Sequence, residues 1–84
     1  MFYVYIIYSK KINKYYVGST ENIDLRIERH NQGTTRFTSQ ANDWVLAYYE
    51  TFNSKSEAIK REYEIKRIKS RKYIESLIEK NWHD

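Results

Sequence analysis

The 84-residue sequence contains no cysteine, and this absence excludes several ways of holding a small protein together. Without thiols there are no disulfides, cysteine-ligated zinc sites or cysteine nucleophiles. Proline is also absent and glycine occurs only twice, so glycine and polar clusters alone interrupt helices and strands. An apolar core must therefore stabilise the fold, and at this length we expect one domain covering residues 1–84.

The sequence also lacks any segment that resembles a membrane span or an export signal. Its opening apolar run, Phe2 to Tyr8, has seven residues, whereas a spanning helix needs about 20. No cationic segment precedes this run, as a signal peptide would require. We therefore expect a cytoplasmic protein with no membrane partner.

Charge and aromatic content narrow the class of protein further. Lysine and arginine outnumber the acidic residues by 15 to 11, a net charge of +4, which is compatible with a polyanionic partner without requiring one. Aromatic residues make up 17% of the chain and include nine tyrosines, which favours a packed core over disorder. Such tyrosines are usually core residues with solvated hydroxyls, but a sheet that stacks RNA bases would have the same composition.

Apolar patterning predicts three strands and three helices. The strands are expected at Phe2–Tyr8, Tyr15–Thr20 and Trp44–Phe52, where β-branched and aromatic residues dominate. The helices are expected from Ile23 to about Gln32, from a capping box at 54–57 to about Lys69, and from Arg71 to about Lys80. The order ββαβαα predicts the α+β class, with a small three-stranded antiparallel sheet flanked by helices.

The connection between the first two strands decides where two tyrosines point. The polar segment 9–14 is expected to form a hairpin turn. If Tyr8 pairs with Tyr15, then Tyr5 lies opposite Gly18 and shares a sheet face with Tyr16. A connection with an odd number of residues would put Tyr5 and Tyr16 on opposite faces. Glycine in a strand often marks a bulge or the close approach of another group, so the stretch 16–18, which ends at Gly18, is a candidate cleft wall.

Glu62 is the acidic residue that is hardest to explain as ordinary surface. The apolar positions of the second helix form an arc, and Glu62 falls near the middle of it. A carboxylate that faces the core needs a cation, hydrogen-bond donors or a metal ion. Three alternatives remain open: a buried salt bridge to Arg26 or a lysine, a metal ligand or general base, or a helix rotated enough to leave Glu62 in water.

His30 shares an apolar helical face with Ile23 and Ile27, and Arg26 lies at the edge of that face. A lone histidine in such a place is usually a hydrogen-bonded core residue. Its i, i+4 spacing from Arg26 also leaves a functional role open, because the two side chains reach the same part of the helix surface.

Basic residues are concentrated late in the chain. The segment 66–72 contains five lysines and arginines and no acid. Such a run is either a solvated helical face or a patch that contacts phosphates. The candidate phosphate contacts are Lys66, Lys69, Arg71 and Lys72.

Together these residues resemble the signature of the GIY-YIG endonuclease superfamily, in its small stand-alone, single-domain branch. The tripeptide 3–5 stands in the place of the GIY motif, and the tripeptide 16–18 stands in the place of YIG. Arg26, His30 and Glu62 follow at spacings that match the family's later positions. The chain is also similar to the N-terminal catalytic domain of the nuclease component of excinuclease ABC. Each tripeptide is a weak signal alone, but the ordered set is specific and spans nearly the whole chain.

The sequence departs from the family pattern at several positions. Tyr3 replaces the first signature glycine, and Ser19 replaces a lysine that many members carry after the second motif, which removes one cation. The loop after the first helix lacks a second histidine, and residues 73–74 are Tyr-Ile where other members have an asparagine. These changes leave the main set of residues intact.

The resemblance implies hydrolysis of phosphodiester bonds in DNA with one divalent cation, Mg²⁺ or Mn²⁺, in DNA repair or processing. Glu62 would hold the cation, and Arg26 would bind the non-bridging phosphate oxygens. Tyr16 would accept the proton of the attacking water, with cations nearby to favour the phenolate. Tyr5 would position that water or share the proton, and His30 would orient Tyr16 or assist the transfer. The basic run would hold the nucleic-acid backbone without sequence preference.

Three functions therefore remain as alternatives. The first is a metal-dependent endonuclease that acts on DNA. The second is a nucleic-acid-binding or recruitment module on the same fold with negligible cleavage. The third is an RNA-binding aromatic sheet or a protein-interaction domain of another fold.

Overall fold

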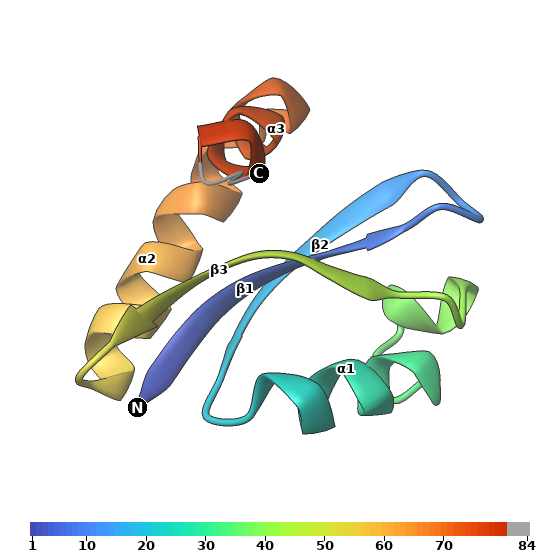
Figure 1. Ribbon diagram of the computed structural model, residues 1–84, viewed down its shortest axis with the longest axis horizontal. Coiled ribbons are helices and arrows are strands. Elements are labelled where there is room, and N and C mark those ends of the chain that lie inside the picture. Colours follow the sequence, from blue (N-terminus) through green and yellow to red (C-terminus); the bar gives the residue numbers. More distant parts are fainter. Residues whose placement is uncertain (81–84) are drawn as a thin grey trace.

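The computed structural model of the protein describes residues 1–80, in which the predicted α+β fold and the order ββαβαα are confirmed (Figure 1). The elements are β1 (Phe2–Ser9), β2 (Lys14–Thr20), α1 (Ile23–Asn31), the short 3₁₀ helix η1 (Thr38–Gln40), β3 (Val45–Phe52), α2 (Lys55–Ile68) and α3 (Arg71–Lys80). The helix η1 lies in a segment that the sequence predicts as loop. The predicted domain 1–84 extends four residues beyond the described part of the chain. No helix within residues 1–80 is long and apolar enough to cross a bilayer.

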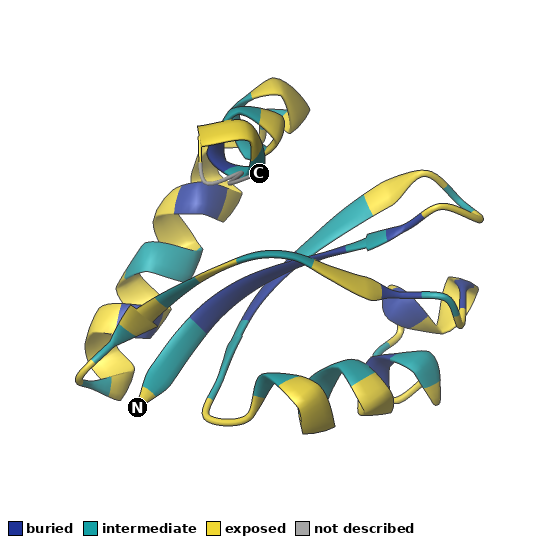
Figure 2. Ribbon diagram, in the orientation of Figure 1, coloured by how far each residue is buried: buried dark blue, intermediate teal, exposed yellow. Residues whose placement is uncertain are grey.

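The sheet is antiparallel, with strand order β2-β1-β3. Strand β1 is central, and its residues Val4 to Ile7 are fully buried (Figure 2). The hairpin has the register in which Tyr8 pairs with Tyr15 and Tyr5 pairs with Gly18. The register confirms the first of the two alternatives, so the side chains of Tyr5 and Tyr16 lie on the same face.

The two faces of the sheet carry two separate cores. Val4 and Ile6 point to one face, where α2 and α3 cover them with Ala58, Ile65 and Leu77. Residues 5 and 7 point to the opposite face and pack with Trp44 and with the isoleucines of α1. Figure 1 shows α1 on one side of the sheet and α2 with α3 on the other. This alternation is the usual consequence of a central strand that is apolar on both faces.

Local hydrogen bonds explain where several elements begin and end. Asn22 caps α1 by accepting from the Leu25 amide at 3.1 Å, and Ser54 caps α2 in the same way. The third strand starts one residue later than predicted. The reason is that Asn31 of α1 binds both backbone groups of Trp44, at 2.7 and 3.1 Å, and so withdraws that residue from strand pairing.

Candidate active site

Five residues predicted from the sequence come together from four elements. Tyr5 comes from β1, Tyr16 from β2, Arg26 and His30 from α1, and Glu62 from α2. The Tyr5 hydroxyl joins two of the other residues: it lies 2.7 Å from His30 Nε2 and accepts a hydrogen bond from Arg26 Nε at 3.3 Å. The tertiary structure thus brings Arg26 to a phenol oxygen rather than to Glu62.

Gly18 allows the Tyr5 side chain to occupy this position. Tyr5 is paired with Gly18 across the hairpin, and its ring tip lies directly over the glycine. A Cβ atom at position 18 would overlap with the Tyr5 hydroxyl. The predicted close approach at this glycine is therefore confirmed, and the approaching group is a site side chain.

A chain of hydrogen bonds continues from Tyr5 into the interior. His30 Nδ1 is 2.9 Å from the hydroxyl of Thr38, which donates in turn to the Thr35 carbonyl at 3.4 Å. The Thr35 hydroxyl also lies 3.1 Å from Nδ1, so a proton on Nδ1 has two oxygens to donate to. Arg26 can only donate to the Tyr5 oxygen, so the proton of Tyr5 needs an acceptor of its own. His30 Nε2 is then left to accept the proton of Tyr5. This network assigns the proton on Nδ1 and makes Tyr5 a hydrogen-bond donor.

Burial keeps both members of this pair uncharged at neutral pH. Burial raises the pKa of Tyr5 to about 12, against a smaller opposing effect of its hydrogen bond from Arg26. Burial also lowers the pKa of His30 to about 4, and the neighbouring positive charge of Arg26 acts in the same direction. The prediction that His30 is a satisfied core residue is confirmed. His30 Nε2 accepts the hydrogen bond of Tyr5, whereas the contact between His30 and Tyr16 is one of ring on ring.

Tyr16 is held by contacts of its ring. The edge of the ring packs on His30, with centroids 5.0 Å apart, and its face stacks with Phe37 at 5.8 Å. The ammonium of Lys66 lies 5.6 Å from the ring centroid. These contacts fix the plane of the phenol beside a positive charge.

Glu62 faces inward and is paired with a lysine. Its side chain is 20% exposed, so the alternative of a fully solvated carboxylate is wrong. The Ser19 hydroxyl donates to Oε1 at 2.6 Å, and Lys66 Nζ lies 2.5 Å from Oε2. The negative charge of Glu62 contributes to the raised pKa of Tyr5, which couples the two sides of the site.

Three residues contact the site in the folded protein although the sequence did not place them beside Glu62 or His30. In the sequence pattern Ser19 marks a lost cation, whereas its hydroxyl binds Glu62 in the folded protein. Lys66 is predicted as part of the basic run, and its i, i+4 spacing from Glu62 is the signal for a local ion pair. Thr38, which contacts His30 Nδ1, lies in η1, in a polar segment whose sequence carries no comparable signal.

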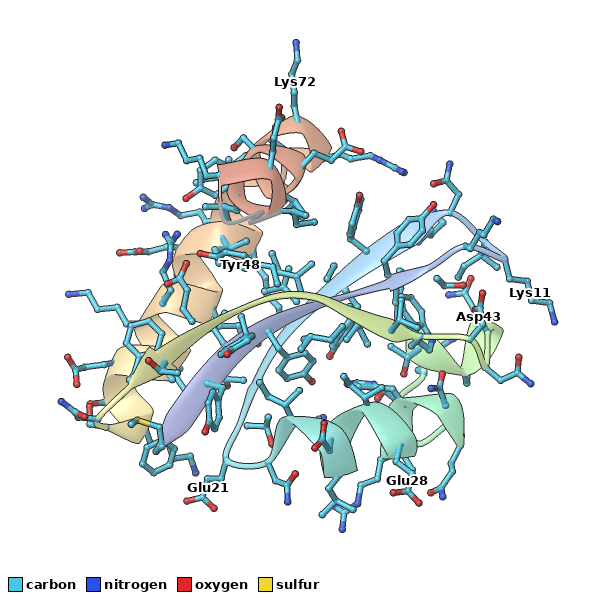
Figure 3. The ribbon with its side chains drawn as sticks, in the orientation of Figure 1. Lys11, Glu21, Glu28, Asp43, Tyr48 and Lys72 are labelled. Atoms are coloured by element: carbon cyan, nitrogen blue, oxygen red, sulfur yellow. The ribbon has the colours of Figure 1, made fainter. Side chains whose placement is uncertain are left out.

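The four predicted phosphate contacts do not form one patch. Lys66, Lys69 and Arg71 line an open groove beside Tyr16, whereas Lys72 extends from α3 away from the rest of the molecule (Figure 3). Arg71 is also occupied by structural contacts. It donates to the carbonyl and to the side chain of Asn13 at 2.9 and 2.6 Å, and its guanidinium lies 5.1 Å from the Tyr15 ring centroid.

The chemistry of Glu62 suits a divalent cation. A carboxylate provides the hard oxygen ligands that Mg²⁺ and Mn²⁺ prefer. Within residues 1–80, no three histidine, aspartate or glutamate side chains gather closely enough to hold a metal ion together. A cation at Glu62 would therefore take most of its ligands from water and phosphate, as Mg²⁺ commonly does.

Known proteins resemble this chain in both sequence and structure. The family model of the GIY-YIG catalytic domain matches residues 1–74. A UPF0213 protein of Staphylococcus haemolyticus is 42% identical over 93% of this chain and 95% of its own length. A UPF0213 protein of Staphylococcus saprophyticus is 38% identical over 92% and 94%. The solution NMR structure of a UPF0213 protein from Bacillus halodurans has a TM-score of 0.60 and 35% identity, covering 96% of this chain and 86% of that one. The chain therefore belongs to the GIY-YIG catalytic-domain family, among the small proteins named UPF0213.

Proposed function

We propose that this protein is a metal-dependent endonuclease that hydrolyses phosphodiester bonds in DNA, in repair or processing. The observation that carries the proposal is the convergence of a half-buried carboxylate, an anchored guanidinium and two tyrosines from four separate elements. Membership of the GIY-YIG family supports a nuclease-type function for the chain. Attack on a phosphodiester needs positive charge for the phosphate oxygens and a proton acceptor for water, and Arg26 and Tyr16 would supply them.

Arg26 would bind the phosphate. Its Nε is engaged by Tyr5, which fixes the plane of the guanidinium and leaves the terminal nitrogens to donate to the non-bridging oxygens. A lysine at this position would keep the charge but lose the two-pronged geometry. Arg26 would therefore both orient the phosphate and balance the charge that develops in the transition state.

Tyr16 would accept the proton of the attacking water, while Tyr5 stays a phenol. Tyr5 already donates its proton to His30, and burial raises its pKa, so it serves as a positioning group. The ammonium of Lys66 lies 5.6 Å from the centre of the Tyr16 ring. A divalent cation bound by Glu62 would supply Lewis-acid stabilisation of the leaving oxygen.

A second candidate function rests on the ion pair between Lys66 and Glu62. The lysine neutralises the carboxylate at 2.5 Å and so competes with a metal ion for Oε2. If that pair persists when DNA is bound, the protein would bind nucleic acid without cutting it. This alternative predicts DNA binding that Mg²⁺ and Mn²⁺ leave unchanged.

Cleavage of a panel of branched and nicked DNA with Mn²⁺ tests the nuclease against the binding module. We expect Glu62→Gln to reduce cleavage at least about 100-fold, because the main source of charge stabilisation is lost. Glu28→Gln is the matched control, since Glu28 is an exposed carboxylate on α1 that points away from the sheet (Figure 3). Tyr16→Phe should keep the fold and stop turnover, since it removes only the hydroxyl. Equal background cleavage by wild type and Glu62→Gln would refute the nuclease.

A further inference from the structure

A groove of about 510 Å³ opens directly beside the candidate active site. It lies between the edge strand β2 and the junction of α2 with α3, and it shares Tyr16 and Lys66 with the site. Its volume falls within the range of about 300–1,000 Å³ that is typical of small-molecule sites.

The charged residues that line the groove are all basic. Its cationic residues are Lys14, Lys66, Lys69 and Arg71, and none of its described lining residues is acidic. Arg71 is held by Asn13 and by Glu75, and Lys66 is held by Glu62, so these two cations are already paired. Lys14 and Lys69 are the cations left for a phosphate at the groove walls.

One wall of the groove is aromatic and rigidly supported. Phe37 stacks on Tyr16 and is itself 38% exposed, so part of its ring remains open to a ligand. Behind it lies Trp44, with ring centroids 6.3 Å apart. Trp44 is buried, and its indole donates to the Thr38 carbonyl at 2.8 Å. The floor of the groove is apolar and includes Val17, Ile65 and Ile74.

We propose that this groove binds one unpaired nucleotide of the DNA strand, next to the phosphate that is cut. The base would stack on Phe37, and its phosphate would contact Lys14 and Lys69. A base inside a duplex has both faces covered, so only an unpaired base can use an aromatic wall in this way. The proposal rests on the proposed nuclease function and specifies its substrate class: DNA with unpaired nucleotides at the cleavage site.

Binding of DNA without cleavage tests the proposal. A blunt duplex and the same duplex with a single-stranded extension that carries one 2-aminopurine are titrated with protein in EDTA. We expect wild type to bind the extended DNA about tenfold more tightly, as one base stack would give, and to quench the 2-aminopurine emission. Phe37→Leu keeps the apolar volume but should lose both effects. Tyr63→Ala, which removes an exposed aromatic on α2 outside the groove, should keep them.

The lysines provide a second and independent comparison. Lys69→Ala should weaken binding of the extended DNA and lower its salt dependence by about one released counterion. Lys72→Ala should not, because Lys72 points away from the groove (Figure 3). Equal affinity of wild type for both DNAs with unchanged emission, or wild-type behaviour of Phe37→Leu, would overturn the proposal.

The outcome is separable from that of the proposed function. Cleavage in Mn²⁺, compared between wild type and Glu62→Gln, reports on the nuclease alone. Quenching in EDTA, compared between wild type and Phe37→Leu, reports on the groove alone. Quenching without cleavage supports the nucleotide-binding groove and refutes the nuclease function. Cleavage without quenching supports the nuclease function and refutes the nucleotide-binding groove.

Discussion

The buried histidine makes the stability of this protein depend on pH in a predictable direction. His30 is completely buried, and its pKa of about 4 lies well below the ordinary value of 6.5. In the unfolded chain the imidazole takes up a proton below about pH 6.5, whereas in the folded protein it does so only near pH 4. The free energy of unfolding is therefore unaffected above pH 6.5 and falls as the pH drops from 6.5 towards 4.

The lowered pKa of His30 sets how much the free energy of unfolding changes with pH. A difference of 2.5 pH units, from 6.5 to 4, corresponds to about 3 kcal/mol when fully expressed, at 1.36 kcal/mol per unit. At pH 5 the protonation of His30 in the unfolded chain lowers the free energy of unfolding by about 2 kcal/mol. Small domains are marginally stable, so this is a substantial part of the total stability.

Urea unfolding at a series of pH values between 7.5 and 4.5 measures the effect. The control is His30→Gln, because a glutamine amide can both accept and donate and does not titrate. All other titratable groups are common to both proteins, so the difference between the two curves isolates His30. We expect wild type to lose about 2 kcal/mol more than the variant between pH 7.5 and 5.

If the free energy of unfolding depends on pH in the same way in wild type and His30→Gln, the argument from the buried histidine is refuted. That result would mean that His30 accepts a proton in the folded state without cost, so that it is not the neutral acceptor of the Tyr5 hydroxyl. A proton NMR titration of the His30 ring in wild type gives a second reading, which does not depend on the folding of the variant. A ring pKa near 6.5 would contradict the buried neutral assignment in the same way.

Two further predictions follow from close contacts in the site. Gly18→Ala should destabilise the protein by about 1–3 kcal/mol in urea unfolding, because the new methyl group meets the Tyr5 ring tip. The loss should shrink in a Tyr5→Leu background, and an equal loss in both backgrounds would contradict the overlap. Lys66→Met should raise the affinity of Glu62 for Mn²⁺ about threefold to tenfold by calorimetry, since a competing cation is removed. Lys60→Met, an exposed lysine elsewhere on α2, should leave that affinity unchanged, and equal affinities for wild type and Lys66→Met would contradict the competition.

Local sequence patterns predicted the elements well, with differences at their ends. The apolar run at residues 2–8 forms a strand, and the capping box at 54–57 begins α2 with Ser54 as its cap. The start of β3 was one residue off, since Asn31 is needed to bind the backbone of Trp44. That contact joins residues far apart in the chain, and no local pattern reports it.

The site was predicted as a set of residues but not as a set of contacts. Tyr5 and Tyr16 lie on one face because the hairpin register places them there, and that register was one of two open alternatives. Glu62 was expected to pair with Arg26 or a lysine, and the structure selects a lysine, Lys66, and adds the hydroxyl of Ser19. Which side chains contact Glu62 depends on how α2 packs against β2.

The sequence by itself therefore determined the elements and the charge, because periodicity and capping are local properties, while its resemblance to a known family supplied the candidate site residues. Only the tertiary structure decided which nitrogen of His30 carries the proton, which cation faces Glu62 and that a groove opens beside Tyr16. These features arise where side chains from β1, β2, α1 and α2 compete for the same space and the same hydrogen bonds. Burial then sets the pKa values of the pair formed by Tyr5 and His30, and burial exists only once the elements have packed together.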